Sequence, residues 1–460
     1  MSKKLYITGI VVAALSIWIG TRWNTWFGNP PEPPYTTSTA PHHILLTFGQ
    51  DQNSRIICWQ AGEEIDRLQS LIYKDESDST AINVENPKAI LDSTRGGKVA
   101  FYSVTLQSLK SGHKYSYCIK PVGVDDAPWY SFEMPKDSQP EHSFIFFGDV
   151  QDSVGGISKS VFKHVANTHS NADFWLFGGD LIERPISCYW DLVFNDLDSI
   201  AQCKPMLAIA GNHEYLKGIR RTLDSRFGNT FQYFQTSKVG ENHVYRLDYN
   251  GASLFLLDSN VDSWQLTDQA DWLEKNLKNC PADNWKIVVL HHPLHSNKGA
   301  YYNLPVKWAF KSLVEDLGVH LVLSGHEHVY ARYNEKEKRK DTTAIDKLPL
   351  YIDSYCSPKH YRLYFDEPED RIGTDGRFYQ KITFNEDALM IETFDAANNG
   401  QLYDKVMLDR SESKPCSVEE FGTSLDPQQV RMSDWYRTVK KPKRVKEYED
   451  DIKKWEMSQK

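Results

Sequence analysis

Residues 144–151 read FIFFGDVQ, residues 174–183 read FWLFGGDLIE, and residues 321–328 read LVLSGHEH. In each stretch a short, largely apolar run predicts a buried strand, and the glycine at its end allows a sharp turn. Gly211-Asn212-His213-Glu214 and His291-His292-Pro293 follow two further apolar runs. Polar side chains at the carboxyl ends of strands in an α/β sheet meet in one crevice. The five motifs therefore predict one polar site in an α/β domain.

The region around the motifs, residues 139–410, alternates buried strands with helix-length segments. Strands are expected at Phe144–Phe147, Phe174–Phe177, Met206–Ala210, Ser253–Leu257, Lys286–Leu290, His320–Leu323, Leu348–Asp353, Phe378–Phe384, Ala388–Asp395 and Gln401–Met407. Helices are expected at Ser158–His169, Thr267–Leu277 and Pro305–Leu317, with a hairpin turn at Asn385-Glu386-Asp387. This order predicts an α/β layered domain, a β-sandwich core flanked by helices.

Residues 42–138 have the pattern of an all-β sandwich domain. Strands are expected at His43–Phe48, Arg55–Gln60, Ser70–Tyr73, Val99–Leu106, Lys114–Lys120 and Trp129–Met134. Residues 109–115, LKSGHKY, resemble the tyrosine corner of fibronectin type III domains, and Trp59 is expected to fill the sandwich core.

The side chains of the five motifs suit metal chemistry. Asp, Asn and His together are the ligand set of a pair of divalent first-row metals. One Gly-Asp turn alone carries no such meaning. Five motifs in order, each at the end of a strand, are an improbable coincidence and predict a metal site.

The order GD, GD, GNH, HxP, GHxH resembles that of the calcineurin-like metallophosphoesterases. With the N-terminal sandwich it is most similar to the purple acid phosphatase branch. The resemblance implies a first metal on Asp149, Asp180 and His328, and a second metal on Asp180, Asn212, His291 and His326. It also implies that His213 binds no metal and instead stabilises or protonates the leaving oxygen. The implied cofactor is two divalent ions drawn from Mn, Zn, Fe and Mg.

Two positions depart from the family pattern. Glu183 stands where purple acid phosphatases have the tyrosine that binds ferric iron, and Gln151 stands where many relatives have histidine. Both changes favour divalent ions over ferric iron. Gln151 is expected either to offer its amide oxygen to the first metal or to face solvent. Glu183 is expected to ligate a metal, to support His213, or to pair with Arg184.

Three residues near the motifs are candidates for substrate contacts. These are Arg184, His292 and His295. His292 has a packing role as its alternative, because the first histidine of His291-His292-Pro293 matches the family ligand. His295 stands in the place of a common tyrosine, and Tyr301-Tyr302 follow where relatives keep leaving-group contacts.

The N-terminus predicts export. Lys3-Lys4 precede an apolar run, Leu5 to Ile19, so residues 1–27 are expected to be a signal peptide or a membrane anchor that tethers the chain through residues 5–21. The protein is then expected to be periplasmic, secreted, or anchored facing outside the cytoplasm. Residues 28–41 are rich in proline and threonine and predict an extended linker.

Charge and cysteines set wider bounds. The net charge of −9 excludes a general nucleic-acid binder, which needs a basic face. Residues 411–460 hold 11 basic and 10 acidic residues and predict a solvated tail or a loosely attached helix. The seven cysteines include no CxxC pair, so disulfides and buried thiols both remain open, with Cys188 and Cys203 able to close a short loop.

These observations predict an exported, metal-dependent phosphoesterase. The resemblance implies hydrolysis of phosphate monoesters by attack of a metal-bridging hydroxide. One alternative is a phosphodiesterase acting on nucleotides or lipid headgroups. Another is a surface binding or adhesion module whose metal site is inert.

Overall fold

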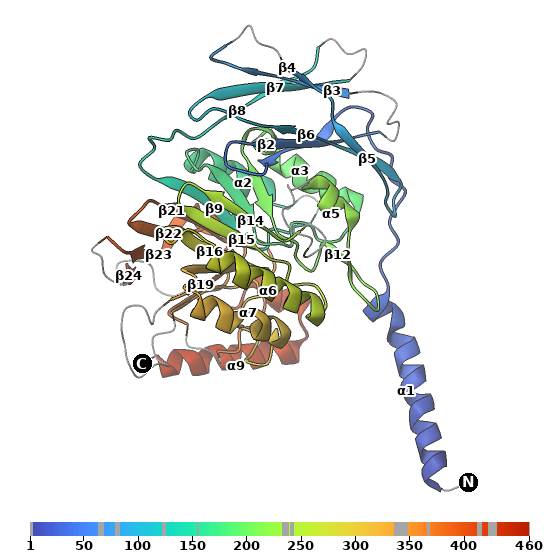
Figure 1. Cartoon of the computed structure of the whole chain (residues 1–460). Coiled ribbons are helices and arrows are strands. Elements are labelled where there is room, and N and C mark those ends of the chain that lie inside the picture. Colours follow the sequence, from blue (N-terminus) through green and yellow to red (C-terminus); the bar gives the residue numbers. More distant parts are fainter. Residues whose placement is uncertain are drawn as a thin grey trace.

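The computed structural model describes most of the chain. The described residues are 3–62, 69–78, 83–121, 126–153, 156–231, 239, 243–334, 348–365, 369–411, 416–421 and 430–459. They form an N-terminal all-β domain stacked on a larger α/β domain, with a helix that projects from the body (Figure 1).

Two four-stranded antiparallel sheets form the N-terminal domain. One has the order β1 (His42–Phe48), β2 (Arg55–Ala61), β6 (Lys98–Leu106), β5 (Lys88–Ser93). The other has the order β4 (Asn83–Glu85), β3 (Gln69–Asp75), β7 (Lys114–Pro121), β8 (Trp129–Glu133). Trp59 is buried between them, and the Lys110 N–H donates a 2.9 Å hydrogen bond to the Tyr115 hydroxyl. The predicted sandwich and its tyrosine corner are confirmed.

Two seven-stranded mixed sheets form the α/β domain. The first has the order β11 (Met206–Ala208), β10 (Phe174–Phe177), β9 (His142–Phe147), β21 (Phe378–Phe384), β22 (Ala388–Asp395), β23 (Gln401–Asp409), β24 (Ser417–Glu420). The second has the order β14 (Tyr245–Tyr249), β15 (Ala252–Leu256), β16 (Trp285–Val289), β17 (Leu321–Ser324), β19 (Leu350–Asp353), β18 (Tyr330–Asn334), β20 (Arg371–Gly373). Their facing sides share one apolar core. The predicted fold class, a β-sandwich core flanked by helices, is confirmed.

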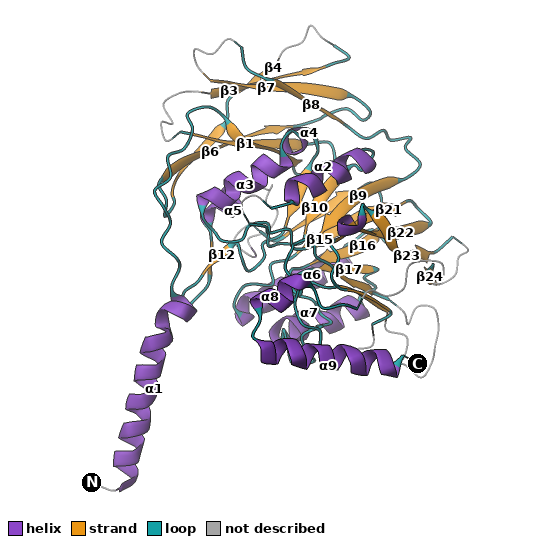
Figure 2. Cartoon of the chain, turned by 180° about the vertical axis from the view of Figure 1, so that it is seen from behind, coloured by secondary structure: helices purple, strands orange, loops and turns teal. Residues whose placement is uncertain are grey.

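Helices cover the outer faces of the two sheets (Figure 2). Helices α2 (Ser158–Thr168) and α3 (Ser187–Leu197) bury apolar side chains against the first sheet. Helices α6 (Ser263–Lys278) and α7 (Leu304–Asp316) do the same against the second. Short connecting elements are α4 (Ile200–Cys203), β12 (Tyr215–Leu216), β13 (Thr222–Leu223), α5 (Ser225–Thr230) and η3 (Ala396–Asn398).

The two domains share part of their core. The Phe48 ring on β1 lies 5.2 Å from the ring of Phe174 and 5.5 Å from that of Tyr249, both in the α/β domain. The Thr47 hydroxyl donates a 2.7 Å hydrogen bond to the Met206 carbonyl. The sandwich is therefore packed onto the α/β domain rather than attached through a linker alone.

The N-terminal segment is a helix followed by a proline-rich stretch that contacts the α/β domain. Helix α1 (Lys3–Phe27) projects away from the two domains (Figure 1). Among the described residues, no helix combines the length and apolar character needed to cross a membrane. Glu32, in the proline-rich stretch, is buried against Arg226, with a 2.6 Å Oε1–Nη1 distance. An ion pair thus fastens this stretch to the α/β domain.

The C-terminal segment is folded where it is described. Helices α8 (Asp434–Val439) and α9 (Pro442–Ser458) bury Tyr436, Tyr448 and Ile452 in a separate apolar cluster. Arg362 pairs with Asp451 at 2.6 Å. The expectation of a solvated tail or loosely attached helix is wrong for this part, because the apolar face of α9 has a partner surface.

No disulfide joins the seven cysteines, all of which lie within the described ranges. Cys188 and Cys203 are exposed on α3 and α4 and are not bonded to each other.

Candidate metal centre

The predicted ligands lie on five loops that meet at the carboxyl ends of strands from both sheets. Asp149 follows β9, Asp180 follows β10, Asn212 follows β11, His291 follows β16, and His326 and His328 follow β17. Strands β9, β10 and β11 are parallel to one another, as are β16 and β17. Their carboxyl ends consequently point the same way within each sheet.

The ligand atoms form two groups that share one carboxylate. Asp180, His291 and His326 make one group, and Asp149, Asp180 and His328 make the other. Within each group the candidate atoms lie within 4.8 Å of one another. Asp180 is the member common to both, as expected of a residue that bridges two ions.

Main-chain carbonyls orient three histidines of the site. The Nδ1 atom of His291 lies 2.9 Å from the Gly178 carbonyl oxygen, and that of His328 lies 2.9 Å from the Lys359 carbonyl oxygen. The Nδ1 atom of His213 lies 2.6 Å from the Glu183 carbonyl oxygen. Because a carbonyl only accepts, each Nδ1 carries the proton, and each Nε2 is left facing the site.

The Nε2 atoms face oxygen atoms at close range. The Nε2 atom of His291 lies 3.4 Å from the Asp180 Oδ1 atom and 3.4 Å from the Asn212 Oδ1 atom. The Nε2 atom of His328 lies 2.9 Å from the Asp149 Oδ2 atom. Lone pairs gathered at this range repel unless a proton or a cation lies between them. The arrangement therefore suits bound cations.

Backbone strain also occurs in the same loops. Asp180, His326 and His328 have φ values of +50°, +74° and +51°. This left-handed region costs a residue other than glycine on the order of 1–3 kcal/mol and typically marks functional sites. Gly325 is required beside them, since a Cβ atom there would lie 2.4 Å from the Asp149 Oδ1 atom.

The pKa shifts of Asp180 and His291, which are both buried, agree with a cation site. Burial alone would raise the pKa of Asp180, but the imidazoles of His291 and His213 outweigh it and hold that pKa well below its usual range. Burial likewise opposes charge on His291, yet Asp180 and Asp149 raise its pKa to about 9. Asp180 therefore stays a carboxylate, and the carboxylates of Asp180 and Asp149 favour a positive charge beside them.

Glu214, the last residue of the Gly211–Glu214 motif, has a role that sequence reasoning missed. Its buried carboxylate accepts hydrogen bonds from the main-chain N–H groups of Asp180 (2.9 Å), Leu181 (2.8 Å), Ile182 (3.3 Å) and Gly211 (2.6 Å). One side chain therefore joins the loop after β10 to the loop after β11. A fully buried glutamate is rare without such partners.

Gln151 is buried, so the solvent-facing alternative is wrong. Its Nε2 atom donates a 3.3 Å hydrogen bond to the Asp180 Oδ2 atom. Its Oε1 atom is buried and has no hydrogen-bond partner among the described residues. Such an acceptor is costly to leave unsatisfied, which fits a further contact with a cation.

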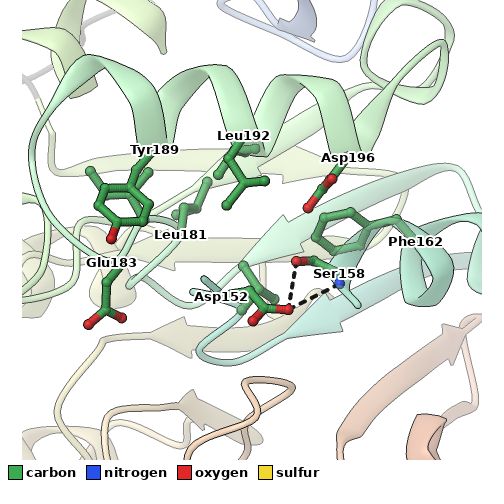
Figure 3. A pocket seen from close by; sticks show the side chains of 11 residues that line it. Asp152, Ser158, Phe162, Leu181, Glu183, Tyr189, Leu192 and Asp196 are labelled. Carbon is green, nitrogen blue, oxygen red and sulfur yellow. Dashed lines mark hydrogen bonds between the residues drawn. The ribbon is translucent and has the colours of Figure 1, made fainter. Parts of the chain in front are cut away.

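Glu183 pairs with a residue that the sequence did not single out. Its carboxylate forms an ion pair with the ammonium group of Lys359, whereas Arg184 is exposed and makes no ion pair with a described residue. The expected Glu183–Arg184 pair is therefore wrong. Figure 3 shows Glu183 beside Tyr189, next to a hollow of about 10 Å³ between α2 and α3. That hollow has room for about one water molecule and no substrate.

The two remaining candidates differ from each other. His295 is buried, with its ring 4.9 Å from the Tyr333 ring and 4.5 Å from the Tyr351 ring, so its expected substrate contact is wrong. The ring of His292 lies 4.2 Å from that of His326, and His292 lines the hollow beside the site. His292 thus remains placed for a substrate contact.

Taken together, the residues fit a pair of divalent ions. The donor set is carboxylate, amide and imidazole, the imidazole tautomers direct Nε2 inward, and buried oxygens of Gln151 and Asp149 lack hydrogen-bond partners among the described residues. Oxygen and nitrogen donors without sulfur suit Mn, Zn, Fe or Mg.

Comparison with known proteins agrees with this picture. The profile of the calcineurin-like phosphoesterase family matches residues 142–330. A probable purple acid phosphatase 20 from Arabidopsis thaliana is 27% identical over 263 residues, which cover 54% of this chain and 58% of the relative. A phosphoenolpyruvate phosphatase from Allium cepa is 26% identical over 348 residues, 68% of this chain and 69% of the relative.

The whole chain also has a structural counterpart. The structure of a purple acid phosphatase from yellow lupin (Lupinus luteus) seeds superposes with a TM-score of 0.67 at 18% identity, over 86% of this chain and 78% of that one. The match to the first Arabidopsis relative spans somewhat more than half of that protein's length. Residues 142–330 thus match the profile of the calcineurin-like phosphoesterase family, and the chain shares its fold with a purple acid phosphatase.

Proposed function

We propose that this protein hydrolyses phosphate monoesters with the help of two divalent ions. The observation that carries the proposal is the pair of ligand groups sharing Asp180, with His213 beside them. Asp149, Asp180 and His328 would hold one ion, with Gln151 as a further oxygen donor. Asp180, Asn212, His291 and His326 would hold the other. When bound, such a pair supplies Lewis acidity toward water and the phosphate oxygens.

His213 is placed to act on the leaving group. Its Nδ1 proton is held by the Glu183 carbonyl, so its Nε2 atom is the one that exchanges protons. That atom lies 3.9 Å from the Asp180 Oδ2 atom, and its side chain is 24% exposed. Water adds to phosphorus and gives up a proton, the bond from phosphorus to the ester oxygen breaks, and that oxygen takes the proton carried on Nε2 by the imidazolium form of His213. The proton given up by water restores the imidazolium form, so the protons balance over one turnover. The products are an alcohol and inorganic phosphate.

Replacing Asp180 by asparagine tests the centre directly. D180N removes the carboxylate shared by both groups, so we expect bound metal to fall and the turnover of a chromogenic monoester to drop more than about a hundredfold. Metal content by mass spectrometry and circular dichroism should be measured on the same sample. Asp248→Asn, at an exposed carboxylate on β14, is the matched control. Unchanged turnover in folded D180N would contradict the proposal and favour the binding-module alternative.

Assays with two substrates distinguish a phosphomonoesterase from a phosphodiesterase. We expect the purified, metal-loaded protein to turn over a nitrophenyl monoester faster than a bis-nitrophenyl diester. A phosphate monoester carries up to two negative charges and a diester one, so a pair of divalent ions would attract the monoester more strongly. Turnover of the diester alone would make the phosphodiesterase alternative the better description.

We also propose that residues 1–27 direct export. The support is the basic pair Lys3-Lys4, the apolar run that follows, and the helix α1 that projects from both domains. Fractionation of cells making the full chain and a chain lacking residues 1–27 tests this. Retention of both forms in the cytoplasm would contradict it.

A further inference from the structure

A hollow of about 570 Å³ opens directly beside one ligand group. Asn212, His292 and His326 form its inner wall. A pocket of this size is typical of small-molecule sites. A phosphate held at the metal centre would therefore have its leaving group in this hollow.

Aromatic rings form the outer wall of the hollow. Tyr301 is 89% exposed and Trp308 is 75% exposed, and the Tyr302 ring stacks 6.3 Å from the ring of His326. The Lys298 ammonium lies 5.2 Å from the centre of the Tyr302 ring and donates a hydrogen bond to the His326 carbonyl. Large exposed rings grouped in a concave surface are typical of ligand-binding sites. They suit a flat ring that can stack on them.

Arginines continue the wall on the other side. Arg221 lines the hollow and also lines a second hollow of about 210 Å³, which Arg220 and the exposed Trp264 share. Arg221 forms no ion pair with any described residue. Its guanidinium is thus available for a planar anion such as a phosphate or carboxylate. Asp258 and Asp262 also line the second hollow, and their carboxylates would repel an anion there. We therefore expect the anion to bind near Arg221, where the two hollows meet.

We propose that the site selects phosphate esters and anhydrides whose leaving group carries both an aromatic ring and a second negative charge. Nucleoside diphosphates are the simplest class with both features. The terminal phosphate would lie at the metal centre, the second phosphate at Arg221, and the base against Tyr301 and Trp308. This inference rests on the proposed phosphoesterase function and adds its substrate class.

Three substrates distinguish the contribution of the aromatic ring from that of the second negative charge. The metal-loaded full chain is assayed with ADP, with phenyl phosphate, which has the ring alone, and with glycerol 2-phosphate, which has neither. We expect the lowest KM for ADP. Arg221→Gln should raise the KM for ADP about tenfold and leave phenyl phosphate unchanged. Trp308→Ala should raise the KM for both aromatic substrates and leave glycerol 2-phosphate unchanged.

Arg444→Gln is the matched control, because Arg444 is exposed on α9 and does not line the hollow. Binding of α,β-methylene-ADP, measured by calorimetry, gives a readout that needs no turnover, and R221Q should weaken it about tenfold. Equal effects of R221Q on all three substrates, or an ADP KM no lower than that of glycerol 2-phosphate, would overturn the substrate class. If the wild type turns over none of them, the proposed phosphoesterase function is wrong. The calorimetric comparison of the wild type with R221Q then tests the Arg221 subsite alone.

Discussion

Glu214 shows how one buried side chain can set the geometry of a metal centre that it does not enter. Its carboxylate accepts from four N–H groups on two loops, including that of Asp180 itself. Replacing it by glutamine would place an N–H₂ group against N–H donors. We expect E214Q to weaken metal binding about 10- to 100-fold, as loss of an outer-sphere partner typically does. Equilibrium dialysis against Mn²⁺ measures this directly.

The control for E214Q is Glu274→Gln, at an exposed glutamate on α6. This variant should bind Mn²⁺ with unchanged affinity. If folded E214Q also binds Mn²⁺ like the wild type, the loops hold their shape without the Glu214 carboxylate, and the positioning role is wrong.

The ion pair of Glu183 and Lys359 joins two segments whose carbonyls each orient a histidine. The Glu183 carbonyl fixes His213, and the Lys359 carbonyl fixes His328. We expect Lys359→Met to lower kcat on a monoester about tenfold and to shift its pH profile, because His213 loses its fixed orientation. Lys359→Arg should restore both, since the charge is kept.

A reversed pair provides the second check. The double variant E183K/K359E keeps one ion pair in the opposite sense, so we expect it to be more active than either single variant. Strictly additive losses would mean that the two side chains act independently of each other.

The stretch of residues 28–41 is an element whose sequence suggests a free spacer and whose contacts make it part of the fold. Burial opposes charge on Glu32, but hydrogen bonds from Arg226 and Ser187 outweigh it and lower the pKa of Glu32. A carboxyl with a lowered folded-state pKa stabilises the fold above its unfolded pKa of about 4.3. That contribution is lost as the pH falls toward the folded value.

We accordingly expect Glu32→Gln to lower the free energy of unfolding by about 1.5 kcal/mol at pH 7, because Arg226 loses one of its two carboxylate partners and keeps Asp224. The difference from the wild type should shrink below about pH 4. Urea unfolding at pH 7 and at pH 3.5 measures both values. A difference that is independent of pH would contradict the linkage to the Glu32 carboxyl.

Strands with a strong apolar pattern were predictable from the sequence almost to the residue. Phe174–Phe177, Phe378–Phe384 and Ala388–Asp395 coincide with β10, β21 and β22. Helix α3 escaped prediction because its apolar residues are mixed with Cys, Asn and Asp and it follows a motif loop. Strand β18 escaped because Tyr330–Asn334 alternates polar and apolar residues that are all buried.

The C-terminal helix α9 has an apolar periodicity that is easily overlooked because the segment is so highly charged. Val445, Tyr448, Ile452 and Trp455 recur at spacings of three, four and three residues, which place them on one face of a helix. Within the site, by contrast, the order of the motifs predicted which ligand residues lie together. It could not give Lys359 or Arg221, because these contacts depend on loops that return from distant parts of the chain.

Across the whole molecule, we expect the sandwich and the α/β domain to unfold as one cooperative unit, because they share part of their core. Phe48→Ala would open a cavity at the junction and should lower the free energy of unfolding by about 3 kcal/mol. Leu71→Ala would do the same inside the sandwich alone, where Leu71 is fully buried. We expect both variants to lower one common thermal transition, followed by calorimetry.

Phe48→Ala and Leu71→Ala also serve as controls for each other, because one acts at the domain junction and the other inside the sandwich. An early, separate transition in L71A with phosphatase activity intact after it would show that the domains unfold independently. A single transition in both variants, with activity lost at the same temperature, agrees with a shared core.

The junction also bears on how such a protein can change over evolutionary time. Phe48 and Thr47 belong to the sandwich but contact Phe174, Tyr249 and Met206 of the α/β domain. Recombination that exchanged the N-terminal hundred residues for another β-domain would need to carry a matching set of these contacts. The two halves are therefore expected to be inherited together, as a single exchangeable block.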